Sequence, residues 1–210
     1  MVKNYDLAVW FKQNHHLNYS PPMEQLLLKM DDKSDVKVIA ASAYHFRIEL
    51  VKKVGKDDIP GLIEISHCMA DRFGAQALLT KTNIPKYFNS ETLPFLARFK
   101  GEIIGYIIGV PLEYFKQESW AHFDVNLGKK NTLYTYAFVV NNKYRGKGGY
   151  GKTLKRIYIN WAKKQKYIYV TGHVEQGMAQ RFSSGTEIVK VFPDWYGLKT
   201  PFEYYRRPLG

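Results

Sequence analysis

Glycine and basic residues are concentrated in one short segment, RGKGGYGKT, which runs from Arg145 to Thr153. Glycine has no Cβ and readily adopts positive φ angles, so successive main-chain amides of such a segment can point toward one anion. A helix that begins directly after the glycines adds the partial positive charge of its N-terminus. The segment therefore predicts a phosphate-binding turn made of main-chain N–H groups and assisted by basic side chains.

The segment from Gly146 to Thr153 also fits the pattern G-x-x-x-x-G-K-[ST], so a P-loop nucleotide-binding protein is one interpretation. A P-loop enzyme needs a second strand that ends in an aspartate to hold Mg²⁺, and most of its sheet follows the loop. Here no Asp or Glu occurs between Asp124 and Glu175, and only about a quarter of the 210-residue chain follows Thr153. These features weigh against a P-loop, which we keep as an alternative.

The wider context of the segment resembles the GNAT superfamily of acyl-CoA N-acyltransferases. An apolar stretch at residues 133–140 runs into NNKYRGKG, which is similar to the family's strand and its V-x-x-x-Y-R-G-x-G turn. Apolar side chains at helical spacing follow, and a further strand is expected from Tyr167. Upstream, ARFKGEIIGYIIG resembles the family's central hairpin. The loop departs from the family pattern [RQ]-x-x-G-x-[GA], because Tyr150 stands where a small residue is expected.

The resemblance implies an α/β fold with a GNAT-like mixed, mostly antiparallel twisted sheet of about six to seven strands, flanked by helices and with splayed central strands. Residues 45–210 are expected to form the acyltransferase domain, and residues 1–44 an N-terminal extension of unclear structure. The strands expected from the sequence are residues 46–51, 93–99, 102–110, 133–140, 187–192 and 202–206, besides the strand from Tyr167. The expected helices are residues 23–30, 83–88, 152–166 and 175–184, together with one that starts at residue 57.

The activity implied by the resemblance is transfer of an acetyl or other acyl group from acyl-CoA to a primary amine, with acetyl-CoA as the default donor. The amine attacks the thioester directly and forms an oxyanion, which the family stabilises with a main-chain N–H of the strand before the loop. In this chain that N–H would belong to Val139 or Val140. The residues assigned to the cofactor are Phe138, Val139, Val140, Arg145, Gly146, Lys147, Gly148, Gly149, Tyr150, Gly151 and Lys152.

The attacking amine must lose a proton, so a base has to lie within reach. Because the strand before the loop contains no acid, we assign this role to His173 or Glu175, near the end of the following strand. A histidine with a pKa near 6.5 is suited to it. Many family members protonate the leaving thiolate with a tyrosine whose position is occupied here by Ser183, so Ser183 is a candidate proton relay. The missing tyrosine leaves a non-catalytic CoA-binding module as a further alternative.

The net charge of +12 indicates an anionic partner, which could be nucleic acid, an anionic membrane surface or an acidic ligand. CoA accounts for part of this charge, and the aromatic residues near the basic helix have the spacing of core residues. We therefore expect no nucleic-acid partner. The acceptor is expected to be a small-molecule or peptide amine, and aromatic residues such as Trp120 and Trp195 are candidates for the walls of its site.

The chain has no apolar run of about 18 residues and no secretory signal, so we expect a cytoplasmic protein without membrane association. The single cysteine, Cys68, excludes an internal disulfide and fits a reducing compartment. The six histidines are scattered, so no metal site is expected. A homodimer stays open, because terminal hairpins of this kind sometimes pair between subunits.

Overall fold

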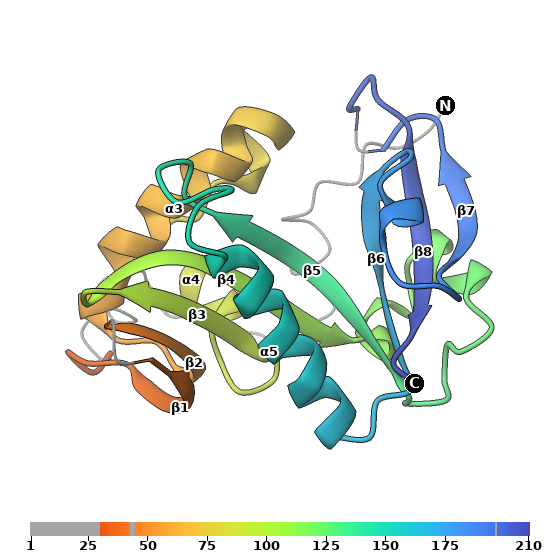
Figure 1. Ribbon diagram of the computed structural model, residues 1–210. Helices are drawn as coiled ribbons and strands as arrows, with labels where there is room; N and C mark the ends of the chain where they lie inside the picture. The colour runs from red at the N-terminus through yellow and green to blue at the C-terminus, as the bar shows by residue number, and fades with distance from the viewer. Residues whose placement is uncertain (1–29, 43–44, 196) are drawn as a thin grey trace. The chain divides into compact units, whose positions relative to one another are not determined.

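The computed structural model describes residues 30–42, 45–195 and 197–210 (Figure 1). The contacts between residues divide the chain into two compact units. Unit 1 comprises the described residues within Met1–Tyr106 and Val139–Gly151, and unit 2 comprises those within Ile107–Phe138 and Lys152–Gly210. Two strands, β4 (Glu102–Pro111) and β5 (Thr132–Val140), contribute residues to both units.

Unit 1 is built on antiparallel strands. The strands β1 (Asp35–Ala41), β2 (Phe46–Lys53) and β3 (Pro94–Phe99) pair in this order, and β3 is followed by the start of β4. Lys100 and Gly101 join β3 to β4 with φ angles of 52° and 89°. Positive φ at both central residues is the geometry of a tight hairpin turn, so the hairpin predicted from the sequence is confirmed.

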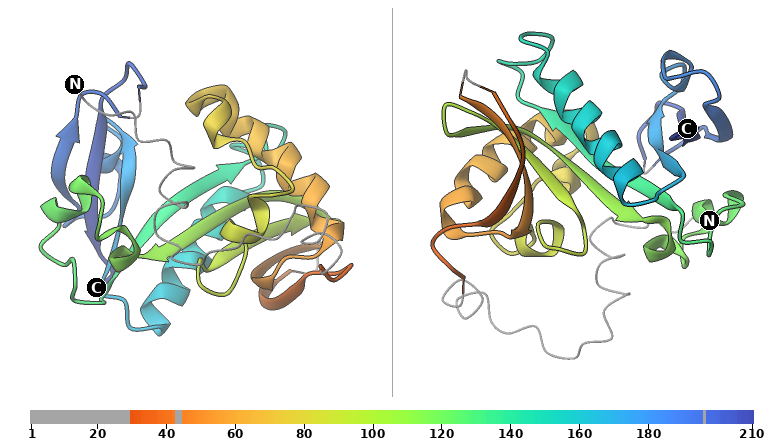
Figure 2. Two further views of the ribbon diagram at one scale, coloured as in Figure 1. Left: turned by 180° about the vertical axis from the view of Figure 1, so that it is seen from behind. Right: turned by 60° about the horizontal axis from the view of Figure 1, so that its bottom comes forward.

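The helices of unit 1 are α3 (Ile59–Phe73) and the short α4 (Ile84–Tyr87), with single turns at η1 (Lys56–Asp58) and η2 (Ala75–Ala77). α3 begins with a proline in its first turn, directly after two aspartates, as predicted. Figures 1 and 2 show α3 lying across one face of β3 and β4. A Cβ added to Gly61 would lie 3.4 Å from Cδ1 of Ile103, so this glycine brings α3 close to β4.

Unit 2 contains a pair of parallel strands. β5 runs parallel to β6 (Tyr169–Glu175), and the connection between them contains α5 (Tyr150–Lys164). β6 pairs with β8 (Phe202–Pro208), whose other edge pairs with β7 (Glu187–Phe192), both antiparallel. The remaining elements are the turns η3 (Leu112–Phe115), η4 (Ser119–Phe123) and η5 (Ala179–Arg181). α5 packs onto the sheet through Tyr158, whose hydroxyl would lie 2.7 Å from a Cβ added to Gly109.

The strands form one mixed sheet in the order β1-β2-β3-β4-β5-β6-β8-β7. The predicted fold class is therefore confirmed, although the eight strands exceed the six to seven expected. The additional strand is β1, which lies in the segment that the sequence left without an assigned structure.

The helix predicted for residues 175–184 is wrong, because only the three residues of η5 are helical there. Gly177 has a φ of 85°, which ends regular helix geometry. The buried carboxylate of Glu203 accepts hydrogen bonds from the amides of Gly177 (2.9 Å) and Ala179 (3.2 Å). The side chain of Glu203, from β8, thus accepts the hydrogen bonds of these two amides, so the segment does not need to form a helix. Apart from Met30, the helix predicted for residues 23–30 falls outside the described residues.

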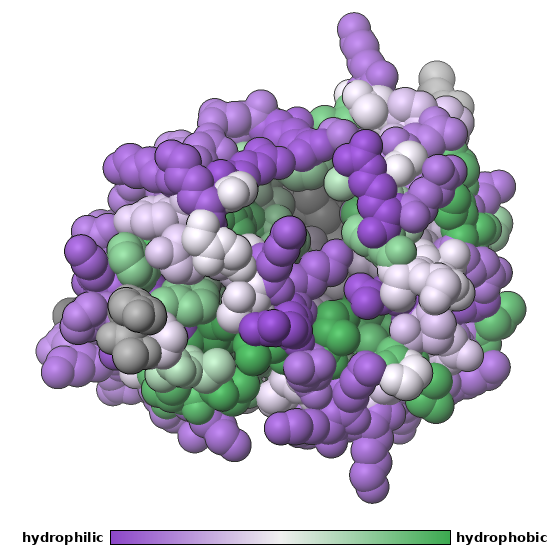
Figure 3. Space-filling model, viewed as in Figure 1, coloured by the Kyte–Doolittle hydropathy of each residue, from purple (hydrophilic) through white to green (hydrophobic). Residues whose placement is uncertain are grey.

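Hydrophilic side chains cover most of the face shown in Figure 3, as expected for a chain in which 24% of the residues are charged. In the described part of the chain, no helix is both long enough and apolar enough to span a bilayer.

Candidate functional site

The glycine turn, defined as residues 145–151, lies in unit 1 between the end of β5 and the first turn of α5. Gly146, Gly148 and Gly149 have φ angles of 73°, 57° and 67°, in the left-handed region that favours glycine. Their amides have no hydrogen-bond acceptor among the described residues, and the first amides of any α-helix also lack one within the helix. The turn therefore offers several free N–H groups next to a helix N-terminus, which is a binding arrangement for phosphate.

The structure explains why Tyr150 is tolerated where the family pattern has a small residue. Its ring packs against Phe46, Phe99 and Tyr144, with ring centroids 5.0, 5.4 and 5.9 Å apart. A Cβ added to Gly148 would lie 2.7 Å from Cζ of the Tyr150 ring. Tyr150 thus anchors the start of α5 in an aromatic cluster, and Gly148 leaves the space that this ring needs.

Three basic side chains in the glycine turn and the first turn of α5 are exposed: Arg145, Lys147 and Lys152. None of them forms an ion pair with another residue in the ranges that the structure describes. An anionic ligand on the turn would therefore meet cations that are not already neutralised. Its negative charge would also make the hydrogen bonds that it accepts from the amides stronger than bonds to a neutral ligand.

The end of β5 combines buried and exposed positions. Val139 is buried and Val140 half-buried, whereas the side chain of Phe138 is 41% exposed. A Cβ added to Gly105 of β4 would lie 2.7 Å from the carbonyl oxygen of Val139. Gly105 is therefore required for the close approach of β4 to the end of β5. The sequence alone did not indicate this role of Gly105.

His173 lies on β6 in unit 2, opposite Tyr204 of β8. Its ring stacks on Trp195 with centroids 3.5 Å apart and on Tyr204 at 4.9 Å, and it meets Trp120 edge-on at 5.0 Å. The hydroxyl of Tyr134 and Nδ1 of His173 are 2.9 Å apart and share a hydrogen bond. We call His173, Tyr134, Trp120, Trp195 and Tyr204 the histidine cluster.

Burial holds the pKa of His173 well below its usual value of 6.5, so the imidazole is neutral at physiological pH. The sequence had suggested a pKa near 6.5, because it could not show this burial. Nε2 of His173 and Nε1 of Trp120 are both enclosed without a hydrogen-bond partner among the described residues. When Nδ1 carries the proton and donates it to Tyr134, Nε2 is left as a free acceptor. A neutral histidine in this state can take a proton.

The other two catalytic candidates lie elsewhere in unit 2. Glu175 is at the end of β6, where it is half-buried and pairs with Phe202 of β8. Ser183 is exposed after η5, and its carbonyl oxygen accepts hydrogen bonds from the amide and the hydroxyl of Thr186. No hydrogen bond joins Ser183 to His173 in the described part of the chain. The structure thus brings His173 together with Tyr134, which the sequence did not single out, because the two residues are 39 positions apart.

The chain is similar to a known family over more than half of its length. A family model described as the acetyltransferase (GNAT) family matches residues 61–183. No curated protein is similar enough in sequence to match the chain.

Several solved structures share the fold at low sequence identity. The ribosomal-protein-S18-alanine N-acetyltransferase of Escherichia coli has 14% identity and a TM-score of 0.54, over 79% of this chain and 94% of that one. A GCN5-related N-acetyltransferase from Kribbella flavida has 15% identity and a TM-score of 0.58, over 80% and 99%. An aminoglycoside 6′-N-acetyltransferase complexed with coenzyme A has 12% identity and a TM-score of 0.53, over 78% and 97%. None of these similarities supports the P-loop interpretation.

Proposed function

Because the chain belongs to the acetyltransferase (GNAT) family and is an N-acyltransferase, we propose that it transfers an acetyl group from acetyl-CoA to a primary amine. The observation that carries the choice of donor is the glycine turn, whose free amides and unpaired cations fit the diphosphate of CoA. The similar aminoglycoside 6′-N-acetyltransferase binds coenzyme A, which supports the same donor here.

In the proposed binding mode, the diphosphate of acetyl-CoA accepts hydrogen bonds from the amides of Gly146, Gly148 and Gly149. Arg145, Lys147 and Lys152 supply positive charge, and Gly151 and Tyr150 form the helix start that the phosphates face. The end of β5, at residues 138–140, holds the acyl end of the cofactor. A main-chain N–H of Val139 or Val140 donates to the oxygen of the thioester carbonyl.

In the proposed reaction, a neutral amine attacks the thioester carbon, so that a C–N bond forms and negative charge collects on the carbonyl oxygen. The C–S bond then breaks and CoA leaves as a thiolate. Nε2 of His173 takes the proton that the amine nitrogen loses, because it is an acceptor without a partner in a neutral ring. Glu175 is the second candidate for this role. The thiolate is protonated by solvent, either directly or through the exposed hydroxyl of Ser183.

Thermal denaturation with different ligands tests the donor. We expect CoA and acetyl-CoA to raise the melting temperature and Mg-ATP to leave it unchanged, since a ligand stabilises the folded state that binds it. Stabilisation by Mg-ATP alone would favour the P-loop interpretation instead.

Release of free thiol from acetyl-CoA over a panel of amines tests the reaction and the acceptor. The panel should include a peptide with an N-terminal alanine and an aminoglycoside, because two of the structurally similar enzymes are named for these acceptors. We expect thiol release that depends on the amine, and a cytoplasmic small-molecule or peptide amine as the natural acceptor. CoA binding without thiol release from any amine would favour the non-catalytic CoA-binding module.

A further inference from the structure

Buried side-chain atoms that lack a hydrogen-bond partner are concentrated in unit 2. Among the described residues they are Nε1 of Trp120, Nδ2 of Asn126, Nε2 of His173 and Nε of Arg207. Buried polar atoms in folded proteins nearly always have a partner, so such atoms need an explanation. Two of them, those of Trp120 and His173, belong to the histidine cluster, where the two rings are in contact with centroids 5.0 Å apart.

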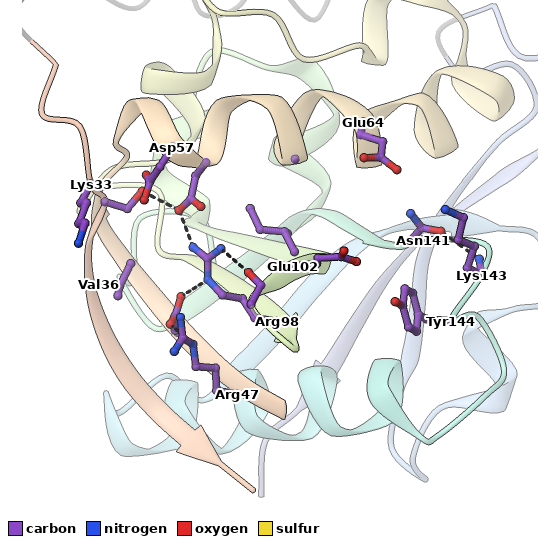
Figure 4. A pocket seen from close by; sticks show the side chains of 16 residues that line it. Lys33, Val36, Arg47, Asp57, Glu64, Arg98, Glu102, Asn141, Lys143 and Tyr144 are labelled. Carbon is purple, nitrogen blue, oxygen red and sulfur yellow. Dashed lines mark hydrogen bonds and ion pairs between the residues drawn. The ribbon is translucent and has the colours of Figure 1, made fainter. Parts of the chain in front are cut away.

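A pocket of about 660 Å³ in unit 1 shows the opposite arrangement (Figure 4). Arg98, which lines it, donates to Glu49 at 2.6 Å and to Asp58 at 2.5 Å. Arg47 donates to the second oxygen of Glu49 at 2.6 Å. These groups satisfy one another, and no described residue that lines the pocket has an enclosed side-chain atom without a partner. The pocket therefore contains no buried group that needs a ligand, whereas the histidine cluster contains two.

Trp120 is held firmly in the cluster. It lies in η4 and is only 5% exposed. Its ring packs against the rings of Phe115 at 5.0 Å, Tyr134 at 4.9 Å and Tyr204 at 5.4 Å. These contacts fix the orientation of the indole beside the imidazole of His173. An indole N–H is a donor only, and it usually has an acceptor when it is buried.

The two nitrogens have opposite hydrogen-bonding roles. Nδ1 of His173 shares a hydrogen bond of 2.9 Å with the hydroxyl of Tyr134, and when Nδ1 carries the proton, Nε2 is an acceptor. Nε1 of Trp120 is a donor in the adjacent ring. A ligand that satisfies both nitrogens therefore needs one donor and one acceptor. The amine of the proposed reaction is the donor, so the acceptor is a second group of the same molecule.

The charges beside the cluster favour an uncharged acceptor group. Arg206, two positions from Tyr204 on β8, is already paired with Asp124 at 2.8 Å and with Glu187 at 2.6 Å. Lys190 of β7 lies opposite Tyr204, but its side chain is exposed. A carboxylate buried in the cluster would therefore meet no unpaired cation from either residue, at a high cost in free energy. A neutral carbonyl or hydroxyl oxygen can accept the indole N–H without this cost.

We propose that Trp120 selects the acceptor by donating its indole N–H to an uncharged oxygen on the carbon next to the one that bears the amine. α-Amino amides have this arrangement, with the amine at Nε2 of His173 and the amide carbonyl at Nε1 of Trp120. The rings of His173 and Trp195 are half-buried, so the cluster adjoins the surface, and a ligand reaches the two nitrogens through a shift of these side chains. This role of Trp120 rests on the proposed function, because it concerns the acceptor of that reaction.

NMR spectroscopy of the full chain tests binding without turnover. Each of the four tryptophans gives one indole N–H signal, and the signal that is missing from Trp120→Phe identifies that of Trp120. We expect glycinamide to shift this signal, in titrations with and without CoA, which carries no acyl group. Propylamine, which lacks the oxygen, and glycine, which carries a carboxylate, should leave the signal unchanged.

Steady-state kinetics with acetyl-CoA tests the selectivity. Trp120→Phe keeps an aromatic ring but removes the N–H, so the ratio of kcat/KM for glycinamide to kcat/KM for propylamine should fall about three- to tenfold, the effect of one hydrogen bond. Phe115→Leu is the matched control, because it loosens the packing on the Trp120 ring and keeps the N–H. It should leave the ratio unchanged.

Three results would overturn the role of Trp120. The first is no shift of its signal by glycinamide, either with or without CoA. The second is an unchanged ratio in Trp120→Phe, and the third is an equal fall of the ratio in Trp120→Phe and Phe115→Leu, which would assign the effect to packing. A shift of the signal by glycinamide alone, without thiol release from acetyl-CoA, would support the amine site and reject the proposed acetyl transfer instead.

Discussion

The glycine turn of unit 1 is made of exposed main-chain groups, whereas the histidine cluster of unit 2 is made of buried and half-buried side chains. The turn depends on three glycines with positive φ and on cations that remain in water. The cluster depends on aromatic rings that remove His173 from water and lower its pKa. A phosphate site can be built from local backbone geometry alone, but a histidine whose pKa lies well below its usual value needs a folded environment around it.

The largest effect is expected from Gly148→Glu in the glycine turn. The new side chain would overlap the ring of Tyr150, strain a residue with a φ of 57° and place a negative charge beside the phosphates. We expect CoA affinity to fall by about 100-fold or more, equal to about 2.7 kcal/mol, as measured by calorimetry. Gly128→Glu is the control, since Gly128 also has positive φ and an added Cβ there meets no atom within 4 Å. Unchanged CoA affinity in Gly148→Glu would remove the turn from the cofactor site.

In the histidine cluster, His173→Gln should lower turnover and leave CoA affinity unchanged. Loss of a general base typically costs about 100-fold or more in rate. Tyr134→Phe removes only the hydrogen bond to Nδ1, so we expect a smaller loss, of about tenfold. Steady-state kinetics and CoA titrations of both variants separate the two effects. Wild-type turnover in His173→Gln would exclude His173 as the base.

The burial of His173 should also appear in the pH dependence of stability. In the unfolded chain the histidine titrates near its usual pKa of 6.5, whereas in the folded chain the pKa is lower. The unfolded state therefore binds more protons below pH 6.5, and the free energy of unfolding falls as the pH decreases, by up to about 1.4 kcal/mol per pH unit. His173→Phe should flatten this slope in urea denaturation measured from pH 7 to 5. The same slope in the variant would contradict the buried, neutral histidine.

The smallest effect is expected at Lys155 of α5, whose ammonium lies 3.9 Å from the centroid of the Phe182 ring. Burial and the nearby charge of Arg207 lower its pKa to about 8. Between about pH 8 and 10.5 the unfolded state binds more protons, so stability should rise with pH in this range, by well under the full linkage value because the group is partly solvated. Lys155→Met keeps the packing on Phe182 and should remove the rise, as measured by thermal denaturation. A rise that persists in the variant would assign it to other groups.

Much of the fold could be predicted from local patterns. Alternating apolar residues and the Lys100-Gly101 turn indicated the hairpin of β3 and β4, and the acids with Pro60 indicated the start of α3. The helix predicted for residues 175–184 failed because Glu203, far along the chain, binds the amides of that segment. A carboxylate supplied by another strand is not visible in a local pattern.

The sequence by itself determined the glycine turn, because positive φ, free amides and a following helix are properties of neighbouring residues. It also determined that cations without nearby acids surround the turn. Only the tertiary structure decided that Tyr150 packs into an aromatic cluster and that Tyr134 and Trp195 meet at His173. Burial depends on segments that are distant in sequence, so the lowered pKa of His173 follows from the folded chain.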